Sequence, residues 1–212
     1  PGPSMPIILT TENKRAMKDF VYLASQSPRR QQLLEQMGVR YELLLAAPDE
    51  DAESLERVIP GEAPLTYVKR VTQLKLEAAV KRMQARHLKA APVLCADTTV
   101  ALGRVILGKP ENAQDAVRIL KTLSGQTHRV LTAVAVASGR QRHLSVSVSK
   151  VTFAPMKLSE IKAYVATGEP FGKAGAYGIQ GMAAAYISDI QGSYTGIMGL
   201  PLFETAELLK TI

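Results

Sequence analysis

Short apolar runs alternate with helical patterns along most of the chain. The run beginning at Phe20 predicts a buried strand, and Ser27 before Pro28 is typical of an N-cap and first helical position. Leucines and Met37 at helical spacing continue this helix until Gly38, a common helix stop. The polar side chains between strand and helix therefore lie at a helix N-terminus, where an anion is favoured. On these residues alone, a phosphate site and a plainly capped surface helix are equally good interpretations.

The middle of the chain predicts a long helix and a central strand. Residues 39–45 predict a second strand, and an acidic loop at 48–53 precedes a helix over 64–87. The apolar stripe expected on that helix consists of Tyr67, Val71, Leu74, Ala78 and Met83. The run 93–102 is typical of a strand buried on both faces, but Asp97 interrupts it. That carboxylate must be paired, hydrogen-bonded or metal-bound, or else accept backbone donors at a bulge.

The second half of the chain predicts a long antiparallel hairpin and a glycine-rich loop. The elements expected there are a strand at 105–107, a helix at 111–123, a loop at 124–128, strands at 129–137 and 142–153, a helix at 158–166, a strand at 184–190, a turn at 192–194 and a helix at 201–209. Val146 and Val148 alternate with polar residues, which predicts one apolar and one wet face. Residues 172–181 contain four glycines and are either a ligand-approaching loop or a plain connector. The whole order predicts an α/β fold with a mixed sheet.

Composition places the chain among ordinary globular proteins and limits the classes of partner that we expect. Its 212 residues are 46% hydrophobic and 21% charged, enough for one domain or a two-lobed unit. The net charge of +7 fits an anionic ligand or simply a basic surface. Because the chain has only 4 Phe, 7 Tyr and no Trp, and lacks a block of like charges, we expect no nucleic acid partner.

Cysteine use and targeting signals exclude several further classes. The one cysteine, Cys95, cannot form a disulfide within the chain and is expected to be a buried thiol. No run approaches the roughly 20 apolar residues of a membrane span, and no signal peptide is visible, so we expect a cytoplasmic protein without a membrane partner. We interpret residues 1–19 as an N-terminal extension. Its first four residues resemble a cloning remnant, with the natural start at Met5.

The residues available for chemistry favour phosphate over covalent catalysis. The chain has no G-x-S-x-G elbow, Walker loop or G-x-G-x-x-G after a strand, and its three histidines lack metal-ligand spacing. What remains is a set of four cations and two carboxylates: Arg29, Arg30, Lys75, Lys109, Glu50 and Asp97. Cations can neutralise phosphoryl oxygens, and carboxylates can hold a divalent ion or orient water. These residue types predict attack of water on a phosphoanhydride.

Seven short motifs, in one order, carry a more specific resemblance. They are Ser25–Arg30, Ala96–Thr98, Gly108–Pro110, Ser124–His128, Ala174–Gly181, Gly192–Tyr194 and Gly199–Pro201. From about residue 21 to 209 the chain resembles the Maf family of nucleoside triphosphate pyrophosphatases. The resemblance implies cleavage between the α and β phosphates, giving a monophosphate and pyrophosphate. It also implies a single domain over 20–212 with a two-lobed, elongated mixed sheet flanked by helices, similar to inosine triphosphate pyrophosphatases, with the nucleotide in a central cleft. A divalent cation, Mg²⁺ or Mn²⁺, and a homodimer are expected with it.

The resemblance also assigns expected roles to residues. The triphosphate- and substrate-binding positions are Ser25, Arg29, Arg30, Lys75 and Thr98. The catalytic positions are Asp97, Glu50, Lys109 and Gln180. Among them Asp97 is the expected general base, Glu50 and Asp97 the expected metal ligands, and Gln180 the expected neighbour of the catalytic centre and base pocket. Asp49 could exchange roles with Glu50, and Leu74 stands before Lys75 where the family usually has Glu.

The glycine-rich loop bears on the substrate. With Tyr177 and Gln180 it resembles the branch acting on dTTP, UTP and modified pyrimidine nucleotides, whereas the 7-methyl-GTP branch tends to carry Phe and Glu there. A glutamine amide can both donate to and accept from a pyrimidine edge. The alternatives are a 7-methyl-GTP pyrophosphatase and a non-catalytic nucleotide-binding regulator linked to septum formation.

Overall fold

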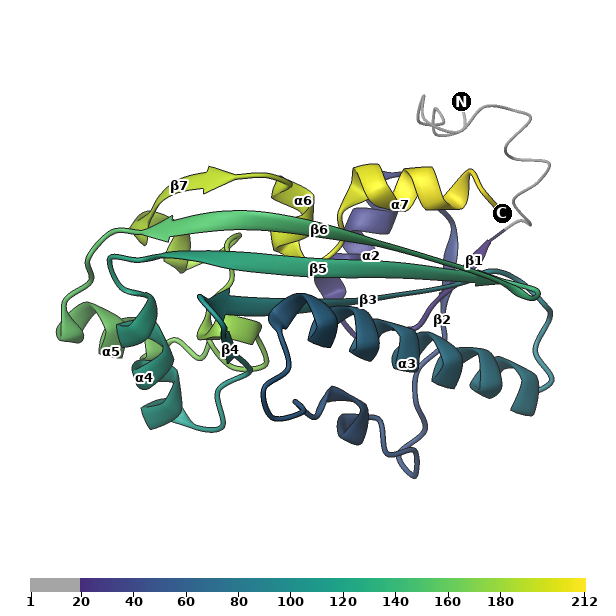
Figure 1. Ribbon diagram of the computed structural model, residues 1–212, viewed down its shortest axis with the longest axis horizontal. Helices are drawn as coiled ribbons and strands as arrows, with labels where there is room; N and C mark the ends of the chain where they lie inside the picture. Colours follow the sequence, from purple (N-terminus) through teal and green to yellow (C-terminus); the bar gives the residue numbers. More distant parts are fainter. Residues whose placement is uncertain (1–19) are drawn as a thin grey trace.

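A single mixed sheet organises the computed structural model, which describes residues 20–212 (Figure 1). Its strands are β1 (Val21–Leu23), β2 (Tyr41–Leu43), β3 (Val93–Leu102), β4 (Val105–Leu107), β5 (Thr127–Ser138), β6 (Gln141–Phe153) and β7 (Ile187–Gln191). Their order is β2-β1-β3-β5-β6-β7, and β4 pairs with β3. Strand β1 runs parallel to β2 and β3, and the other pairs are antiparallel. The predicted α/β fold with a mixed sheet is confirmed.

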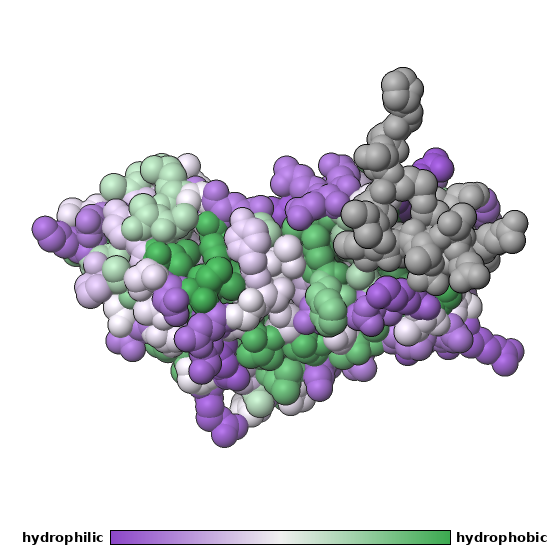
Figure 2. Space-filling model, turned by 90° about the horizontal axis from the view of Figure 1, so that it is seen from above, coloured by the Kyte–Doolittle hydropathy of each residue, from purple (hydrophilic) through white to green (hydrophobic). Residues whose placement is uncertain are grey.

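Helices cover both faces and one end of this sheet (Figure 1). They are α2 (Pro28–Gln36), α3 (Pro64–Ala85), α4 (Ala113–Leu123), α5 (Leu158–Ala166), α6 (Tyr194–Met198) and α7 (Leu202–Leu209), with short 3₁₀ turns η1 (Glu53–Glu56), η2 (Ala174–Ala176) and η3 (Met182–Tyr186). Helix α3 lies along β3 and β5, while α6 and α7 pack on the opposite face. Figure 2 shows the face of α6 and α7, where apolar patches lie between hydrophilic ones.

Strand β3 connects the two lobes of the core. Val100 belongs to the cluster that packs α4, α5 and the glycine-rich loop together. Toward the other end, Leu94 faces the cluster under α2 and α7, and Cys95 faces the one under α3. Cys95 is fully buried, as predicted, and burial raises the pKa of its thiol to about 12. Asp97 therefore lies on the strand that both lobes share.

The packing corrects two predicted apolar faces, one on α3 and one on β6. On α3, Leu74 is 40% exposed, and Val68, Leu76 and Ala79 are buried instead, because the helix lies flat on β3 and β5 with a face shifted around its axis. The helix also ends at Ala85 rather than at residue 87.

On β6 the valine pattern predicts the wrong face. Val148 is 48% exposed, whereas Ser147 and Ser149 are buried. Gly192 covers Ser149, and a Cβ added to Gly192 would lie 2.6 Å from the Ser149 Oγ atom. Gly196 covers Ser147, and a Cβ added there would lie 2.8 Å from the Ser147 Oγ atom. Small residues on both sides allow this close packing.

Other differences concern element bounds. Residues 127–128 begin β5 instead of ending a loop, η3 replaces the first part of the strand predicted at 184–190, and the turn predicted at 192–194 leads into the short helix α6. The β3–β5 register runs without a shift through Asp97, opposite Ala133, so the predicted alternative of a bulge at Asp97 is wrong. The interpretation of residues 1–19, including a start at Met5, lies outside the described residues. Every helix within 20–212 is too short or too polar to cross a bilayer.

Candidate active site

A cleft of about 1280 Å³ opens between the lobes, beside the middle of β3. Its walls come from the β1–α2 junction, the 44–56 segment, α3, β3, the glycine-rich loop and the end of α6. The predicted site residues that line it are Ser25, Arg29, Arg30, Glu50, Lys75, Asp97, Thr98 and Lys109. Gln180 is exposed and does not line it. The structure thus brings together eight of the nine predicted positions, which lie up to 84 residues apart in the chain.

The junction of β1 and α2 has the predicted local structure. Ser27 caps α2, its hydroxyl accepting from the backbone N–H of Arg30 at 3.4 Å, and Pro28 follows at the first helical position. The Ser25 hydroxyl accepts from the backbone N–H of Ser27 at 3.2 Å. Because the cap fixes the start of the helix, the next two side chains, Arg29 and Arg30, are directed from a defined backbone position at the cleft wall.

Arg30 is held by the protein, and Arg29 is not. The Arg30 guanidinium donates to the Gly199 carbonyl at 2.7 Å, to the Ser25 hydroxyl at 3.3 Å and to the Thr98 hydroxyl at 3.2 Å. The Arg29 side chain makes no hydrogen bond or ion pair within residues 20–212, and burial lowers its pKa. A half-buried cation without a carboxylate favours an anionic ligand.

Lys173 of the glycine-rich loop extends this positive region. Its ammonium donates to the Glu169 carbonyl at 2.6 Å. Burial, and then the charge of Arg29, lower its pKa. We call Arg29, Arg30 and Lys173 the arginine group.

A second set of charges lies around the middle of β3. The Lys75 ammonium of α3 contacts Asp97 Oδ1 at 2.6 Å and Glu56 Oε1 at 2.7 Å. The Lys109 ammonium, in the turn after β4, contacts Glu56 Oε2 at 3.3 Å. Burial alone would lower the pKa of Lys75, but the two carboxylates raise it. We call Lys75, Lys109, Asp97 and Glu56 the lysine–carboxylate cluster.

Glu50 lies in the cleft wall but is held by α3. Its carboxylate accepts from Arg82 at 2.7 Å and Arg86 at 3.4 Å, and from the backbone N–H of Ala47 at 3.2 Å. The hydrogen bond from Arg82 is the main reason why its pKa is lowered. Both Glu50 oxygens are thus engaged by arginines, and Glu50 would have to release Arg82 to join Asp97 on a metal ion.

The carboxylates of the cleft can supply only part of the coordination of a divalent cation. Within residues 20–212, no three side chains of His, Cys, Asp or Glu converge as a metal cage. Mg²⁺ is often held by only one or two carboxylates, with substrate phosphates and water completing its coordination. Asp97 suits that arrangement, because Lys75 contacts one of its oxygens and its side chain lines the cleft.

A buried pair of side chains, Tyr177 and His128, fixes the glycine-rich loop to β5. The Tyr177 hydroxyl lies 2.7 Å from His128 Nε2, and both side chains are almost fully buried beside Phe153. Gly175 of the same loop lies so close to β3 that an added Cβ would be 2.9 Å from Val100. Tyr177 thus supports the loop and also lines the cleft, together with its neighbours Lys173 and Ile179.

Three of the charged cleft residues whose contacts are described above are not among the predicted site residues: Glu56, Arg82 and Lys173. Glu56 lies three residues beyond the acidic loop predicted at 48–53, and nothing in the residue order marks it as the acid that meets two lysines. Lys173 stands inside the recognised glycine-rich segment, which could have drawn attention to it.

A cleft lined by convergent cations and a buried carboxylate defines a protein that binds phosphorylated ligands. The chain belongs to the Maf family: the family model described as "Maf-like protein" matches residues 20–212. It is 66% identical to the dTTP/UTP pyrophosphatase of Polaromonas sp. (strain JS666 / ATCC BAA-500), over 91% of this chain and 95% of that protein. It is 64% identical to the dTTP/UTP pyrophosphatase of Albidiferax ferrireducens, over 92% and 98% of the two chains. The predicted family resemblance is confirmed.

A solved structure is more distantly similar. The Staphylococcus aureus Ham1 protein matches with a TM-score of 0.41 and 14% identity, over 65% of this chain and 73% of that chain. A similarity of this size carries no functional conclusion.

Proposed function

We propose that this protein hydrolyses dTTP and UTP to the monophosphate and pyrophosphate. The observation that carries the proposal is the cleft in which the arginine group and the lysine–carboxylate cluster meet. Membership of the Maf family and relatives at 61–66% identity that are named dTTP/UTP pyrophosphatase support this substrate class. The role is removal of excess or modified pyrimidine nucleotides.

The triphosphate binds through the cations of the cleft. Arg29 is free to form a charge-assisted, bidentate contact with phosphate oxygens, beside the N-terminus of α2. Arg30 is fixed by Ser25 and Thr98, so its remaining N–H groups face the ligand from a preset position. Lys75 and Lys109 neutralise charge on the leaving pyrophosphate.

Asp97 is the general base. Lys75 holds one of its oxygens at 2.6 Å, which orients the carboxylate and leaves the other oxygen to accept a proton from water. Water then attacks the α phosphorus in line with the leaving pyrophosphate. Gln180 is exposed in this structure, so a base contact by its amide requires the loop to move.

A divalent cation, Mg²⁺ or Mn²⁺, fits beside Asp97 together with the phosphates. When bound, it supplies Lewis-acid polarisation of the phosphoryl oxygens. The proposed contribution of Glu50 to this ion requires that Glu50 exchange Arg82 for the ion. We also propose, from the family resemblance, that the protein acts as a homodimer in the cytoplasm.

The test is pyrophosphate release from dTTP, UTP, CTP, GTP, ATP and 7-methyl-GTP, with Mg²⁺ and with Mn²⁺. We expect turnover of dTTP and UTP. A preference for 7-methyl-GTP would keep the chemistry and contradict the substrate assignment. Binding of nucleotides without any release would instead support the non-catalytic regulator.

A further inference from the structure

We propose that Glu169 is a positioning residue for substrate binding, which together with Tyr164 fixes the glycine-rich loop so that Lys173 faces the cleft beside Arg29. Neither Glu169 nor Tyr164 lines the cleft, so both act through the loop. We call these two residues the loop anchor. The inference rests on the proposed function, because it takes the ligand to be a nucleoside triphosphate.

The side chains of the loop anchor hold the second half of the glycine-rich loop. The Glu169 carboxylate accepts from the Tyr164 hydroxyl at 2.8 Å through Oε1, and from the backbone N–H of Met182 at 3.2 Å through Oε2. The Tyr164 hydroxyl in turn accepts from the backbone N–H of Gly178 at 3.3 Å. Burial, and then the hydrogen bond to Glu169, raise the pKa of Tyr164, so its hydroxyl stays protonated and donates. The segment from Gly178 to Met182, which contains Gln180, is therefore held at both ends.

The backbone of Glu169 holds the first half of the loop through Lys173. The Glu169 carbonyl accepts from the Lys173 ammonium group at 2.6 Å. A Cβ added to Gly178 would lie 3.2 Å from Lys173 Cε, so the lysine side chain packs against the part of the loop that Tyr164 holds. Burial and the charge of Arg29 lower the pKa of Lys173, and the Glu169 charge acts in the opposite direction. A lysine that is already fixed and charged loses less side-chain entropy when it binds a phosphate group.

Gly181 provides the space that the Glu169 carboxylate occupies. A Cβ added to Gly181 would overlap this carboxylate, which supplies the three atoms nearest to it. The backbone φ of Gly181 is −106°, a value that residues with side chains also adopt. The carboxylate, and not the backbone, therefore requires glycine at this position. A methyl group here would displace Glu169 from both Tyr164 and Met182.

The experiment compares Glu169→Ala and Glu169→Gln with Glu35→Gln. Glu35 also accepts from a tyrosine hydroxyl, that of Tyr41 at 2.7 Å, but it lies exposed on α2 and does not line the cleft. Steady-state kinetics give KM and kcat for dTTP, and calorimetry measures binding of α,β-imido-dTTP, which resists cleavage between the α and β phosphates.

The loss of the loop anchor should act on binding rather than on turnover. We expect Glu169→Ala to raise KM and to weaken binding of the analogue about tenfold, while kcat changes less than about threefold. Glu169→Gln keeps one of the two acceptor oxygens, so we expect partial rescue, with an effect of about threefold. Glu35→Gln should change KM and binding less than about twofold. A purely structural role would lower the folded fraction, and with it the apparent kcat, without changing KM.

Gly181→Ala tests the same contact from the other side. We expect it to raise KM about as much as Glu169→Ala does, and to add less than about twofold when the two changes are combined, because the carboxylate that it displaces is already gone. Should Glu169→Ala fail to fold, Glu169→Gln and Gly181→Ala still provide the comparison. Multiplying effects of Gly181→Ala and Glu169→Ala on KM would overturn the inference, and so would an unchanged KM with a reduced kcat in either variant.

The binding measurement separates this inference from the proposed function, because it needs no turnover. If the variants weaken binding of the analogue as expected but the natural protein hydrolyses no nucleotide, the proposed function is wrong and the loop anchor is still supported. If the natural protein hydrolyses dTTP and the variants bind the analogue as the natural protein does, the loop anchor alone is wrong.

Discussion

The two ends of the cleft hold their cations in different ways. In the lysine–carboxylate cluster, each ammonium group contacts a carboxylate at 2.6–3.3 Å. In the arginine group, Arg30 and Lys173 are held by carbonyl and hydroxyl oxygens, and Arg29 has no partner within residues 20–212. The first region is electrically balanced and the second is positive.

This difference separates two tasks. A balanced cluster containing a buried carboxylate can hold a base and orient a proton transfer. A positive group whose cations form no direct ion pair with a carboxylate within residues 20–212 attracts and holds a polyanion. Substitutions in the cluster should therefore act mainly on kcat, and substitutions in the arginine group mainly on KM.

The largest effect is expected for Asp97→Asn. Loss of the general base should lower kcat about 10²- to 10⁴-fold, since a well-placed base contributes about that much. Pyrophosphate release from dTTP measures it, with Asp189→Asn on exposed β7 as the control. A folded Asp97→Asn protein with full turnover would show that this region does not supply the base.

Acid should weaken the support of the glycine-rich loop, which carries Lys173 of the arginine group. Burial lowers the pKa of His128 from 6.5 to about 4, so the folded protein keeps it neutral while the unfolded chain takes up a proton. Its contribution to stability is complete above pH 6.5, declines as pH falls toward 4, and amounts to about 3 kcal/mol at most. In the protonated ring both nitrogens carry a hydrogen, and Nδ1 has no acceptor within residues 20–212.

The measurement is the free energy of unfolding between pH 7 and pH 4 for the natural protein and for His128→Gln. The variant should be less stable at pH 7 and should lose less stability on acidification. Parallel pH curves for the two proteins would contradict a buried neutral histidine.

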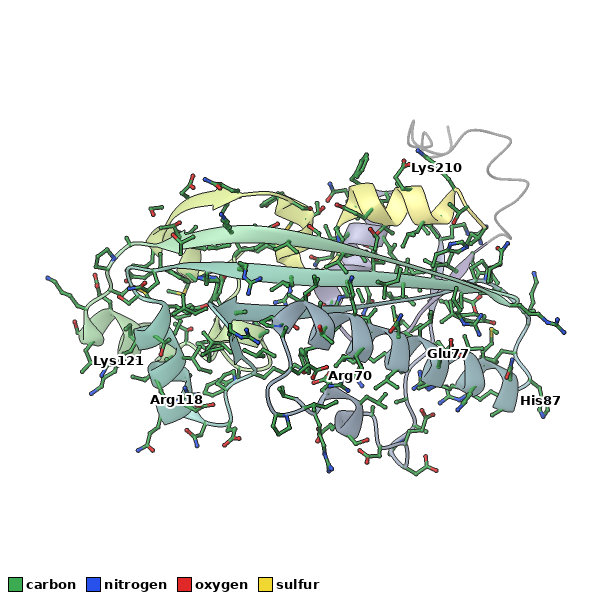
Figure 3. All side chains as sticks on the ribbon, viewed as in Figure 1. Arg70, Glu77, His87, Arg118, Lys121 and Lys210 are labelled. Atoms are coloured by element: carbon green, nitrogen blue, oxygen red, sulfur yellow. The ribbon has the colours of Figure 1, made fainter. Side chains whose placement is uncertain are left out.

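Arg29→Ala should sharpen the contrast between the two regions. It should raise KM for dTTP about tenfold to a hundredfold, because a hydrogen bond to a charged group is worth about 1.5–3 kcal/mol. Thermal stability should change little, since Arg29 binds nothing else within residues 20–212. Arg118→Ala is the control, because Arg118 lies on α4 at the outer end of the molecule (Figure 3). A fall in kcat with an unchanged KM would contradict the assignment of substrate binding to the arginine group.

The smallest effect is expected at the 44–56 segment. Glu50→Gln should lower kcat/KM about fivefold, because it weakens a partly exposed ion pair with Arg82 worth roughly 1 kcal/mol. Asp49→Asn should leave it unchanged. An effect of Glu50→Gln as large as that of Asp97→Asn would show that Glu50 leaves Arg82 and serves the reaction directly.

Local features of the fold followed from residue order. Ser27 and Pro28 predicted the start of α2, and the apolar run around Asp97 predicted β3, because capping and burial on both faces leave signals within a few residues. Face assignments on α3 and β6 were wrong at Leu74 and Val148. Which face is covered depends on elements distant in the chain, such as α6 over Ser147 and the Gly192 turn over Ser149.

By itself, the sequence determined the α/β class, the family motifs and eight residues of the cleft, because each motif combines a distinctive residue type with a local backbone signal. Only the tertiary structure decided which charges meet. Glu50 lies on Arg82, Glu56 bridges Lys75 and Lys109, and Gln180 stays outside the cleft. Such pairings depend on long side chains from separate elements reaching one point in space. The spacing of residues along the chain does not predict the distance between their charged groups.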